Sequence, residues 1–343
     1  MATFSKFVRP ETPRSGVITD RDLDIIDAIL RYRFSPTSEL ARLVGGREDV
    51  NVKRLRKLWE AAVVNRFAFP GIRAHSEFIY YLDSMKALDL LVHHGRVQEI
   101  HPQMAEEIRL NREADYAGAA VRGQHMKLGF LQHSLMISRF HFMLEMSSRD
   151  PKNGVRLALW RHGSDLRGDK VEVPELTSRR VEGSNEYVWQ EHDFKTVRLP
   201  VEPDALFTLR FADRSDPVHF FYEADRGSMP LADMMKKFRA YRAFIKRGLH
   251  KEAFGVHPIR AVLIETTDEP RARKLMDVVQ SPSVLGTTRQ SALFWLAISP
   301  LFTSSTNSSG LLYLTSPGIV LERLWALPER SLRSFADKDK LEG

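Results

Sequence analysis

The chain has 343 residues, 43% of them hydrophobic and 28% charged, which is enough for two or three globular domains. It has no cysteine, which excludes disulfides, thiolate metal sites and cysteine nucleophiles and fits a reducing cytoplasm. The net charge of +7 favours a polyanionic partner, and no apolar run is typical of a membrane span or a signal peptide. We therefore expect a cytoplasmic protein with no membrane partner.

The first 95 residues predict a flexible arm and a small DNA-binding fold. Residues 1–18 form the arm, and Thr19 is the expected N-cap of the first helix because acids follow it. Three helical apolar stripes come next, the third from about Val50 to Asn65, and two aromatic-rich runs then read as short strands joined by a loop. Three short helices with a β-hairpin are typical of a winged helix-turn-helix, which we assign to residues 19–95.

Cations concentrate on the third of these helices. Lys53, Arg54, Arg56 and Lys57 lie there, with Glu60 as the opposing charge nearby. In a winged helix this element enters the major groove, so we expect these side chains to bind DNA and release counterions. The alternatives are a solvated helix face and a winged helix that contacts protein.

The rest of the chain predicts a linker, a larger domain and a tail. We assign residues 96–122 to a helical linker, 123–328 to the domain and 329–343 to the tail. In the domain the order α-β-β-β-α-β-α-β predicts a mixed-sheet α/β fold. The first three strands are expected at Val155–Trp160, Val197–Phe211 and Val218–Ala224. Residues 161–195, between the first two strands, are expected to form an insertion or a long hairpin.

Two acidic motifs lie on adjacent strand-like runs of this domain. Asp204 follows Pro203 and opens the run ALFTLRF, and the next run, VHFFYEAD, carries Glu223 and Asp225. Neighbouring strands hold side chains next to each other, and hard divalent cations prefer oxygen ligands. We therefore expect Asp204, Glu223 and Asp225 to hold Mg²⁺ or Mn²⁺. In the alternative interpretation, Asp204 is an ordinary turn residue and Glu223 lies in solvent at a strand end.

A strongly basic helix follows the acidic run. Seven cations and no acid lie between Lys236 and Lys251, and we expect Lys236, Arg239 and Arg242 to contact DNA. Lys237 and Tyr241 are four residues apart and share a helix face, from which they could reach the carboxylates as catalytic residues. The alternative is a solvated amphipathic helix.

These motifs together resemble a known family. The segments TDRDLDIIDAILRYRFSPTSELARLV, RLRKLWEAAVVNR, PDALFTL and FFYEADRGSMPL resemble the replication-relaxation proteins of plasmids and mobile elements, over about residues 19–270. The resemblance implies a winged helix followed by a domain similar to the PD-(D/E)xK nucleases, in which Asp225 stands where the motif has lysine. Lys237 and Tyr241 are similar to the Q-x-x-x-Y motif of RecB-like nucleases, with lysine replacing glutamine.

The resemblance is compatible with an enzyme and with a protein that has no catalytic activity. In the enzyme, Asp204 and Glu223 would hold the metal and Lys237 would orient the attacking water for phosphodiester cleavage. In the alternative, the nuclease fold is a binding platform for a non-catalytic regulator or a replication or mobilisation accessory. A third interpretation makes the winged helix a dimer contact. The implied partners are duplex or forked DNA, replication or mobilisation proteins, and a second copy of the chain.

Overall fold

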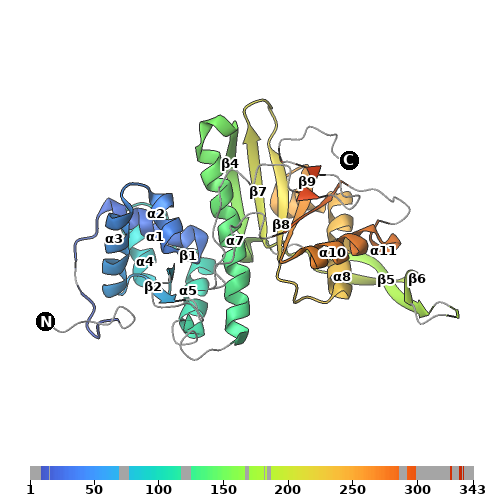
Figure 1. Ribbon diagram of the computed structural model, residues 1–343, viewed down its shortest axis with the longest axis horizontal. Helices are drawn as coiled ribbons and strands as arrows, with labels where there is room; N and C mark the ends of the chain where they lie inside the picture. The colour runs from blue at the N-terminus through green and yellow to red at the C-terminus, as the bar shows by residue number, and fades with distance from the viewer. Residues whose placement is uncertain are drawn as a thin grey trace. The chain divides into compact units, whose positions relative to one another are not determined.

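The computed structural model of the chain describes most of its residues and divides it into two compact units (Figure 1). The division falls between Phe142 and Met143, inside one long helix, and we call the two parts the N-terminal and the C-terminal unit. Both contain helices and strands, so the expected mixed α/β class is confirmed. The described residues are 9–14, 16–68, 77–116, 125–166, 170–180, 182–183, 187–285, 292–298, 325–326, 332–333 and 335.

The N-terminal unit consists of short helices around a small three-stranded sheet with the order β1-β3-β2, antiparallel throughout. The loop expected between β2 and β3 lies at residues 69–76, outside the described residues. The elements are α1 (Asp20–Tyr32), β1 (Ser35–Pro36), α2 (Thr37–Val44), α3 (Glu48–Glu60), β2 (Asn65–Ala68), β3 (Phe78–Tyr81), α4 (Met85–His93) and α5 (Pro102–Ala114).

The start of α1 is stabilised by a capping box. The Thr19 side chain accepts a hydrogen bond from the backbone N–H of Asp22, and the Asp22 carboxylate accepts one from the backbone N–H of Thr19, with an N–O distance of 2.9 Å. Thr19 is therefore confirmed as the N-cap. The same carboxylate accepts from the Arg54 guanidinium of α3 at 3.1 Å. The first turn of α1 and the middle of α3 are thus held together by one side chain.

The long helix α7 (His125–Arg149) belongs to the N-terminal unit as far as Phe142. The Ser138 hydroxyl donates to the Phe34 carbonyl at 2.7 Å, and the Arg139 guanidinium donates to the buried Glu39 carboxylate at 3.1 Å. The His141 ring stacks on Tyr32 with 4.1 Å between centroids. Residues up to 142 thus group with the N-terminal unit, whereas the sequence pattern assigns residues from 123 onward to the second domain.

The C-terminal unit is built on one mixed sheet with the order β12-β11-β10-β9-β8-β7-β4. The pairs β4–β7 and β7–β8 are antiparallel, and β8–β9 and β9–β10 are parallel. Every residue of β9 is buried, as expected for a central parallel strand covered on both faces. The strands are β4 (Val155–His162), β7 (Ala205–Phe211), β8 (Val218–Asp225), β9 (Ile259–Thr266), β10 (Phe294–Ile298), β11 (Trp325–Ala326) and β12 (Leu332–Arg333).

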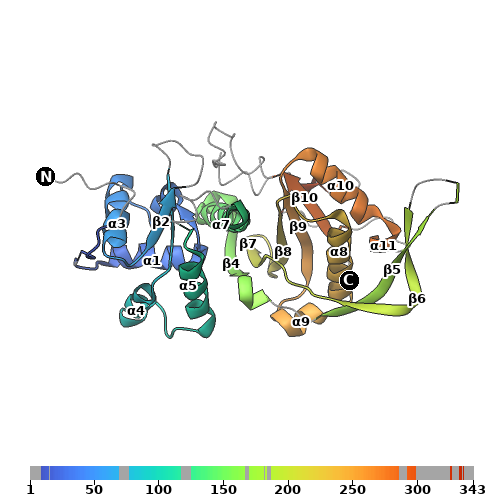
Figure 2. The same cartoon turned by 90° about the horizontal axis from the view of Figure 1, so that it is seen from below.

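The two faces of this sheet are covered differently. Helices α8 (Leu231–Lys246) and α10 (Glu269–Gln280) lie beside one face (Figure 2), where Phe238 of α8 packs with Phe221 and Val262 of the sheet. The other face carries an aromatic cluster that includes Phe220 and Phe335, whose ring centroids lie 5.1 Å apart. The short helices α9 (Leu249–Phe254) and α11 (Pro282–Leu285) complete the unit, with 3-10 turns at Pro151–Asn153 and Gly163–Leu166.

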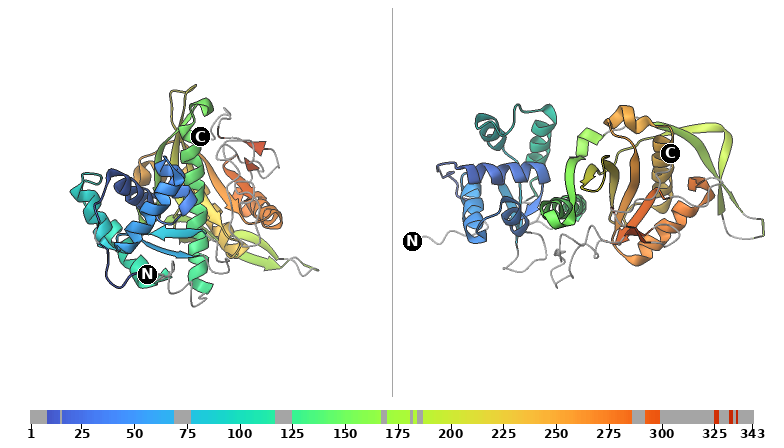
Figure 3. Two further views of the ribbon diagram at one scale, coloured as in Figure 1. Left: turned by 60° about the vertical axis from the view of Figure 1, so that its left-hand side comes forward. Right: turned by 90° about the horizontal axis from the view of Figure 1, so that it is seen from above.

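A two-stranded hairpin is inserted between β4 and β7. It consists of β5 (Val171–Arg180) and β6 (Tyr187–Leu199) and extends away from the sheet (Figure 3). The sequence pattern predicts one strand over Val197–Phe211, but the structure has a break at residues 200–204. Pro200 and Pro203 lack the N–H groups that a continuous strand would need there. The break places Asp204 immediately before β7.

No helix in the described part of the chain is long and apolar enough to cross a membrane. The strands expected near residues 155–160 and 218–224 are confirmed as β4 and β8, and the apolar run at residues 291–299 contains β10. The hairpin accounts for the expected insertion at residues 161–195.

A buried histidine in α9 makes the stability of the C-terminal unit depend on pH. Burial lowers the pKa of His250 to about 4, and nearby His257 and Lys251 add to the effect. His250 takes up a proton more readily in the unfolded chain than in the folded protein. The contribution of neutral His250 to stability is therefore fully present above pH 6.5 and is lost as the pH falls toward its folded-state pKa of about 4.

We expect the variant His250→Gln to lose less stability on acidification than the wild type. Urea unfolding at about pH 7.5 and about pH 4.5 measures the difference. His101→Gln is the control, because the His101 side chain is 56% exposed. Equal acid sensitivity of wild type and His250→Gln would contradict the assignment.

Candidate functional site

The structure brings Asp204 and Glu223 together across two adjacent strands. Ala205 lies opposite Tyr222 in the antiparallel β7–β8 register, so one further step places Asp204 opposite Glu223. Their side chains are hydrogen-bonded to each other, and the Asp204 carboxylate also accepts from the backbone N–H of Ala224 at 2.8 Å. Two acids that lie far apart in sequence thus form one carboxyl pair.

Helix α8 contributes two donors to the same carboxylate. The Lys237 ammonium donates to Oε2 of Glu223, and the Tyr241 hydroxyl donates to Oε1. These two residues are one helical turn apart, so they point to the same side of α8. Glu223 is only 3% exposed, and each of its oxygens has a donor. We call Asp204, Glu223, Lys237 and Tyr241 the carboxylate–lysine site.

Burial sets the protonation of this site. It raises the pKa of Glu223 to about 8, with Lys237 opposing the effect and Asp204 adding to it. Burial also raises the pKa of Asp204, against the charge of Lys237 and the Ala224 N–H. For Lys237, burial lowers the pKa, but Glu223 and Asp204 raise it above its ordinary value. At neutral pH the site therefore keeps a lysine cation beside a carboxyl pair that holds a proton readily.

Asp225 is held outside this site. The guanidinium of Arg271 on α10 binds both of its carboxylate oxygens, at 2.8 and 3.1 Å, and the Thr266 hydroxyl donates to it at 2.8 Å. Within the described ranges, no group of three or more His, Asp or Glu residues could hold a metal ion. Asp225 thus does not converge with Asp204 and Glu223 as the expected third ligand, because an arginine captures its carboxylate.

Arg271 is a residue that sequence reasoning missed. It lies 46 positions from Asp225, and no local pattern links the two. It also donates to the carbonyl of Met229 at 2.7 Å, which holds the segment between β8 and α8 against α10. The two acids of β8 thus each have a cation beside them, Lys237 for Glu223 and Arg271 for Asp225, and both cations are supplied by helices.

The basic residues of α8 are not equivalent. Lys236 pairs with Asp233 at 2.8 Å near the surface, and Arg242 is partly exposed. Arg239 is only 5% exposed, and its guanidinium donates to the carbonyls of Ser283 and Pro174 and to the Glu191 carboxylate, at 2.9, 2.7 and 2.9 Å. Arg239 is one of the residues expected to contact DNA, and partners from the hairpin and α11 use its donors inside the unit. Its contact with DNA stays a prediction.

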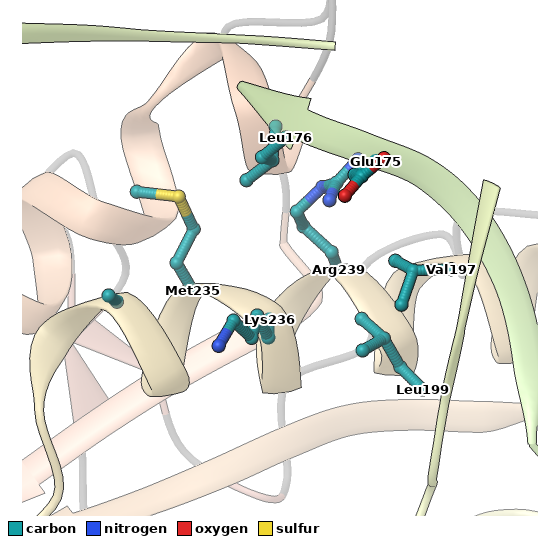
Figure 4. A pocket seen from close by; sticks show the side chains of 8 residues that line it. Glu175, Leu176, Val197, Leu199, Met235, Lys236 and Arg239 are labelled. Atoms are coloured by element: carbon teal, nitrogen blue, oxygen red, sulfur yellow. The ribbon is translucent and has the colours of Figure 1, made fainter. Parts of the chain in front are cut away.

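Arg239 lies at a cavity between α8 and the hairpin (Figure 4). The cavity has a volume of about 160 Å³ and is mostly apolar. Its lining residues are Glu175, Leu176, Val197, Leu199, Ala232, Met235, Lys236 and Arg239.

We expect Arg239→Ala to destabilise the C-terminal unit by on the order of 3 kcal/mol, because two backbone carbonyls, one of them in a buried hydrogen bond, lose a charged donor. Urea unfolding monitored by circular dichroism measures the change. Lys236→Ala removes a more exposed cation from the same helix and should change stability by less than about 0.5 kcal/mol. Similar losses in the two variants would contradict the bridging role of Arg239.

The cations of helix α3 in the N-terminal unit also differ in their ion-pair partners. Arg54 pairs with Asp22 at 3.1 Å and Arg56 pairs with Glu60 at 2.9 Å. The Lys53 side chain is 77% exposed and lies 3.9 Å from an Asp49 oxygen, and Lys57 is exposed. Lys53 and Lys57 are thus the cations of this group most available to a ligand.

Comparisons with known proteins give one finding. The family model described as replication-relaxation matches residues 27–259, from within α1 to the first residue of β9. The match contains α3, Asp204, Glu223, Lys237 and Tyr241, but it ends before Arg271. No curated protein and no solved structure matches the chain.

Proposed function

Because the chain belongs to the replication-relaxation family, we propose that it is a replication-related DNA-binding protein of plasmids or mobile elements whose C-terminal unit cleaves DNA. The N-terminal unit would bind duplex DNA as a winged helix. The carboxylate–lysine site would carry out metal-dependent phosphodiester cleavage. The observation that carries this proposal is Glu223, which meets Asp204 from the next strand and Lys237 from α8.

The donor set of the site fits a hard divalent cation. Asp204 and Glu223 offer carboxylate oxygens from neighbouring strands, the ligand type that Mg²⁺ and Mn²⁺ prefer. Their hydrogen bond and the raised pKa of Glu223 reflect two acids held close together away from water. A cation held by both carboxylates would relieve the repulsion between them. When bound, Mg²⁺ or Mn²⁺ would lower the pKa of a water and neutralise charge on a phosphate.

The chain's own residues would orient and polarise the reactants. Lys237 remains protonated beside Glu223, so it can donate to a phosphate oxygen or to the attacking water. Tyr241 is buried, and its hydroxyl fixes the second oxygen of Glu223. The Ala224 N–H holds the Asp204 carboxylate in the same way. These contacts preorganise the two acids, so that little reorientation is needed when a substrate binds.

The DNA-binding part of the proposal rests on α3. The order α1-β1-α2-α3-β2-β3 is the one that a winged helix needs, with α3 as the element that enters the major groove. Lys53 and Lys57 are exposed on it, and Arg56 is 55% exposed despite its pairing with Glu60. Phosphate contacts from such residues supply the salt-dependent part of DNA affinity.

We expect the double variant Lys53→Ala/Lys57→Ala to bind duplex DNA more weakly. The slope of log K against log salt should become less steep by about 0.9 for each lost phosphate contact. Fluorescence anisotropy at several salt concentrations measures both quantities. Lys152→Ala/Lys274→Ala removes two exposed cations of the C-terminal unit and is the charge-matched control. Unchanged affinity and slope in the α3 variant would refute its DNA contact.

The enzymatic part is tested with purified wild type on single-stranded, duplex and forked DNA. Cleavage should require Mn²⁺ or Mg²⁺ and should stop in a chelator. The second candidate function is a non-catalytic replication accessory, and one observation favours it. Asp225 stands at the lysine position of the nuclease motif, and Arg271 neutralises it. An accessory would bind DNA equally well in a chelator and would cleave none of the three forms.

A further inference from the structure

The second half of α8 and the start of α9 carry cations that the fold does not use. Seven cations lie between Lys236 and Lys251 with no acid among them. Three of the seven have partners inside the unit: Lys236 pairs with Asp233, Lys237 with Glu223, and Arg239 with Glu191. The other four, Arg242, Lys246, Arg247 and Lys251, make no ion pair with any described residue. We call these four residues the basic end of α8.

The four cations of the basic end lie within ten residues of the chain, Arg242 to Lys251. Arg242 and Lys246 are four residues apart on the same side of α8, and Arg247 is its C-cap. Gly248 has a φ of 70°, a left-handed conformation that turns the chain into α9. A Cβ placed on Gly248 would lie 3.7 Å from Cε of Lys251. The Lys251 side chain therefore lies over this turn. Lys246, Arg247 and Lys251 are all exposed.

Helix stability explains only part of this cluster. Cations near a helix C-terminus interact favourably with the helix dipole, but each contributes only about 0.3–1 kcal/mol at an exposed position. Unpaired cations held close together repel one another. Their concentration at one end of the helix is therefore unfavourable in the free protein. A bound polyanion would relieve this repulsion, and its phosphate contacts would release counterions.

We propose that the basic end of α8 is a second DNA-binding surface, which contacts the phosphate backbone without reading sequence. This inference rests on the proposed function, and it places a phosphate contact in the same unit as the carboxylate–lysine site. Arg242 directly follows Tyr241 in sequence, and Lys246 lies nine residues after Lys237 on the same helix. Nine residues make two and a half helical turns, so Lys246 faces the side of α8 opposite Lys237, about 14 Å further along the helix axis. One helix thus carries the cleavage site on one side and the proposed phosphate contact on the other.

The chemistry of the basic end favours DNA over an anionic membrane surface. A helix that lies in a membrane interface exposes large apolar side chains beside its cations. Among the described residues of α8 and α9, none of the large hydrophobic side chains is exposed. The one nearby acid of α9 is Glu252, next to Lys251, so the surface keeps a clear positive excess.

The test compares two triple variants of the full chain. Lys246→Gln/Arg247→Gln/Lys251→Gln removes three charges from the basic end. Lys152→Gln/Arg156→Gln/Lys274→Gln removes three exposed charges that are scattered over the same unit. Affinity for DNA of mixed sequence is measured across a salt series, and circular dichroism with thermal unfolding checks that each variant is folded.

We expect the clustered variant to bind more weakly than wild type, with a slope less steep by up to about 0.9 for each of its three charges. The scattered variant should stay close to wild type. Equal losses in the two variants would mean that only net charge matters, and an unchanged clustered variant would mean that the surface makes no contact. Either result overturns the inference but leaves the proposed function standing. Failure of the wild type to bind DNA at all would instead overturn the proposed function.

Discussion

Asp204→Asn is expected to reduce metal-dependent cleavage of DNA by about a thousandfold or more. The substitution keeps the side-chain shape but removes one of the two carboxylates that would hold the cation. A loss of a few kcal/mol in transition-state stabilisation has this size, because each 1.36 kcal/mol corresponds to about tenfold in rate. A nicking assay with Mn²⁺ on supercoiled and forked DNA measures the rate.

Two further variants make this test specific. Asp216→Asn removes an exposed acid from the turn between the same strands, β7 and β8, at their other end, and it should cleave like wild type. Asp204→Asn/Lys237→Met should be no worse than Asp204→Asn alone, since residues that act as a unit show non-additive losses. Full activity in Asp204→Asn would refute the mechanism, and inactivity of wild type on every DNA form would favour the accessory function.

Lys237→Met is expected to reduce cleavage by about a hundredfold, the effect of removing one preorganised donor. If the role of this lysine is to place a cation beside Glu223, a lysine at position 225 should take it over. Residues 223 and 225 point to the same face of β8, because side chains alternate along a strand. Arg271 must be removed at the same time, since it would otherwise lie against the new lysine.

The restoring variant is therefore Lys237→Met/Asp225→Lys/Arg271→Ala, and we expect it to recover part of the lost activity. Lys237→Met/Asp225→Ala/Arg271→Ala is the matched control, because it makes the same changes without the new cation. The binding affinity for DNA, measured in a chelator, should be similar in the two triple variants. Equal cleavage by the two would show that a cation at this place is not what Lys237 contributes.

The elements of the fold could be predicted because their patterns are local. The apolar spacing in α1 and α3, the apolar run in β8 and the N-cap at Thr19 each depend on residues within a few positions of one another. The break between β6 and β7 was missed although Pro200 and Pro203 mark it. Prolines there outweigh the apolar character of the run, which extends on both sides of them.

The parts of the site that local patterns could not predict depend on distant partners. Asp225 and Arg271 meet only because α10 packs beside β8, and Arg239 reaches Pro174 only because the hairpin folds back over α8. The meeting of Asp204 and Glu223 was predictable in principle, since the two acids lie on consecutive strands that pair antiparallel. Whether an acid has a metal ion or a buried arginine as its partner depends on which helix packs beside it.

The inserted hairpin also bears on the order in which the C-terminal unit assembles. The edge strand β4 can pair with β7 only after residues 163–204 have closed into a loop. Forming β5 and β6 first brings Val171 opposite Leu199, so that only short connections remain on either side. Hairpins form in about 1–10 μs, and shorter loops lose less chain entropy on closure. Once the hairpin has formed, β4 and β7 can pair by closing two short connections instead of one long loop.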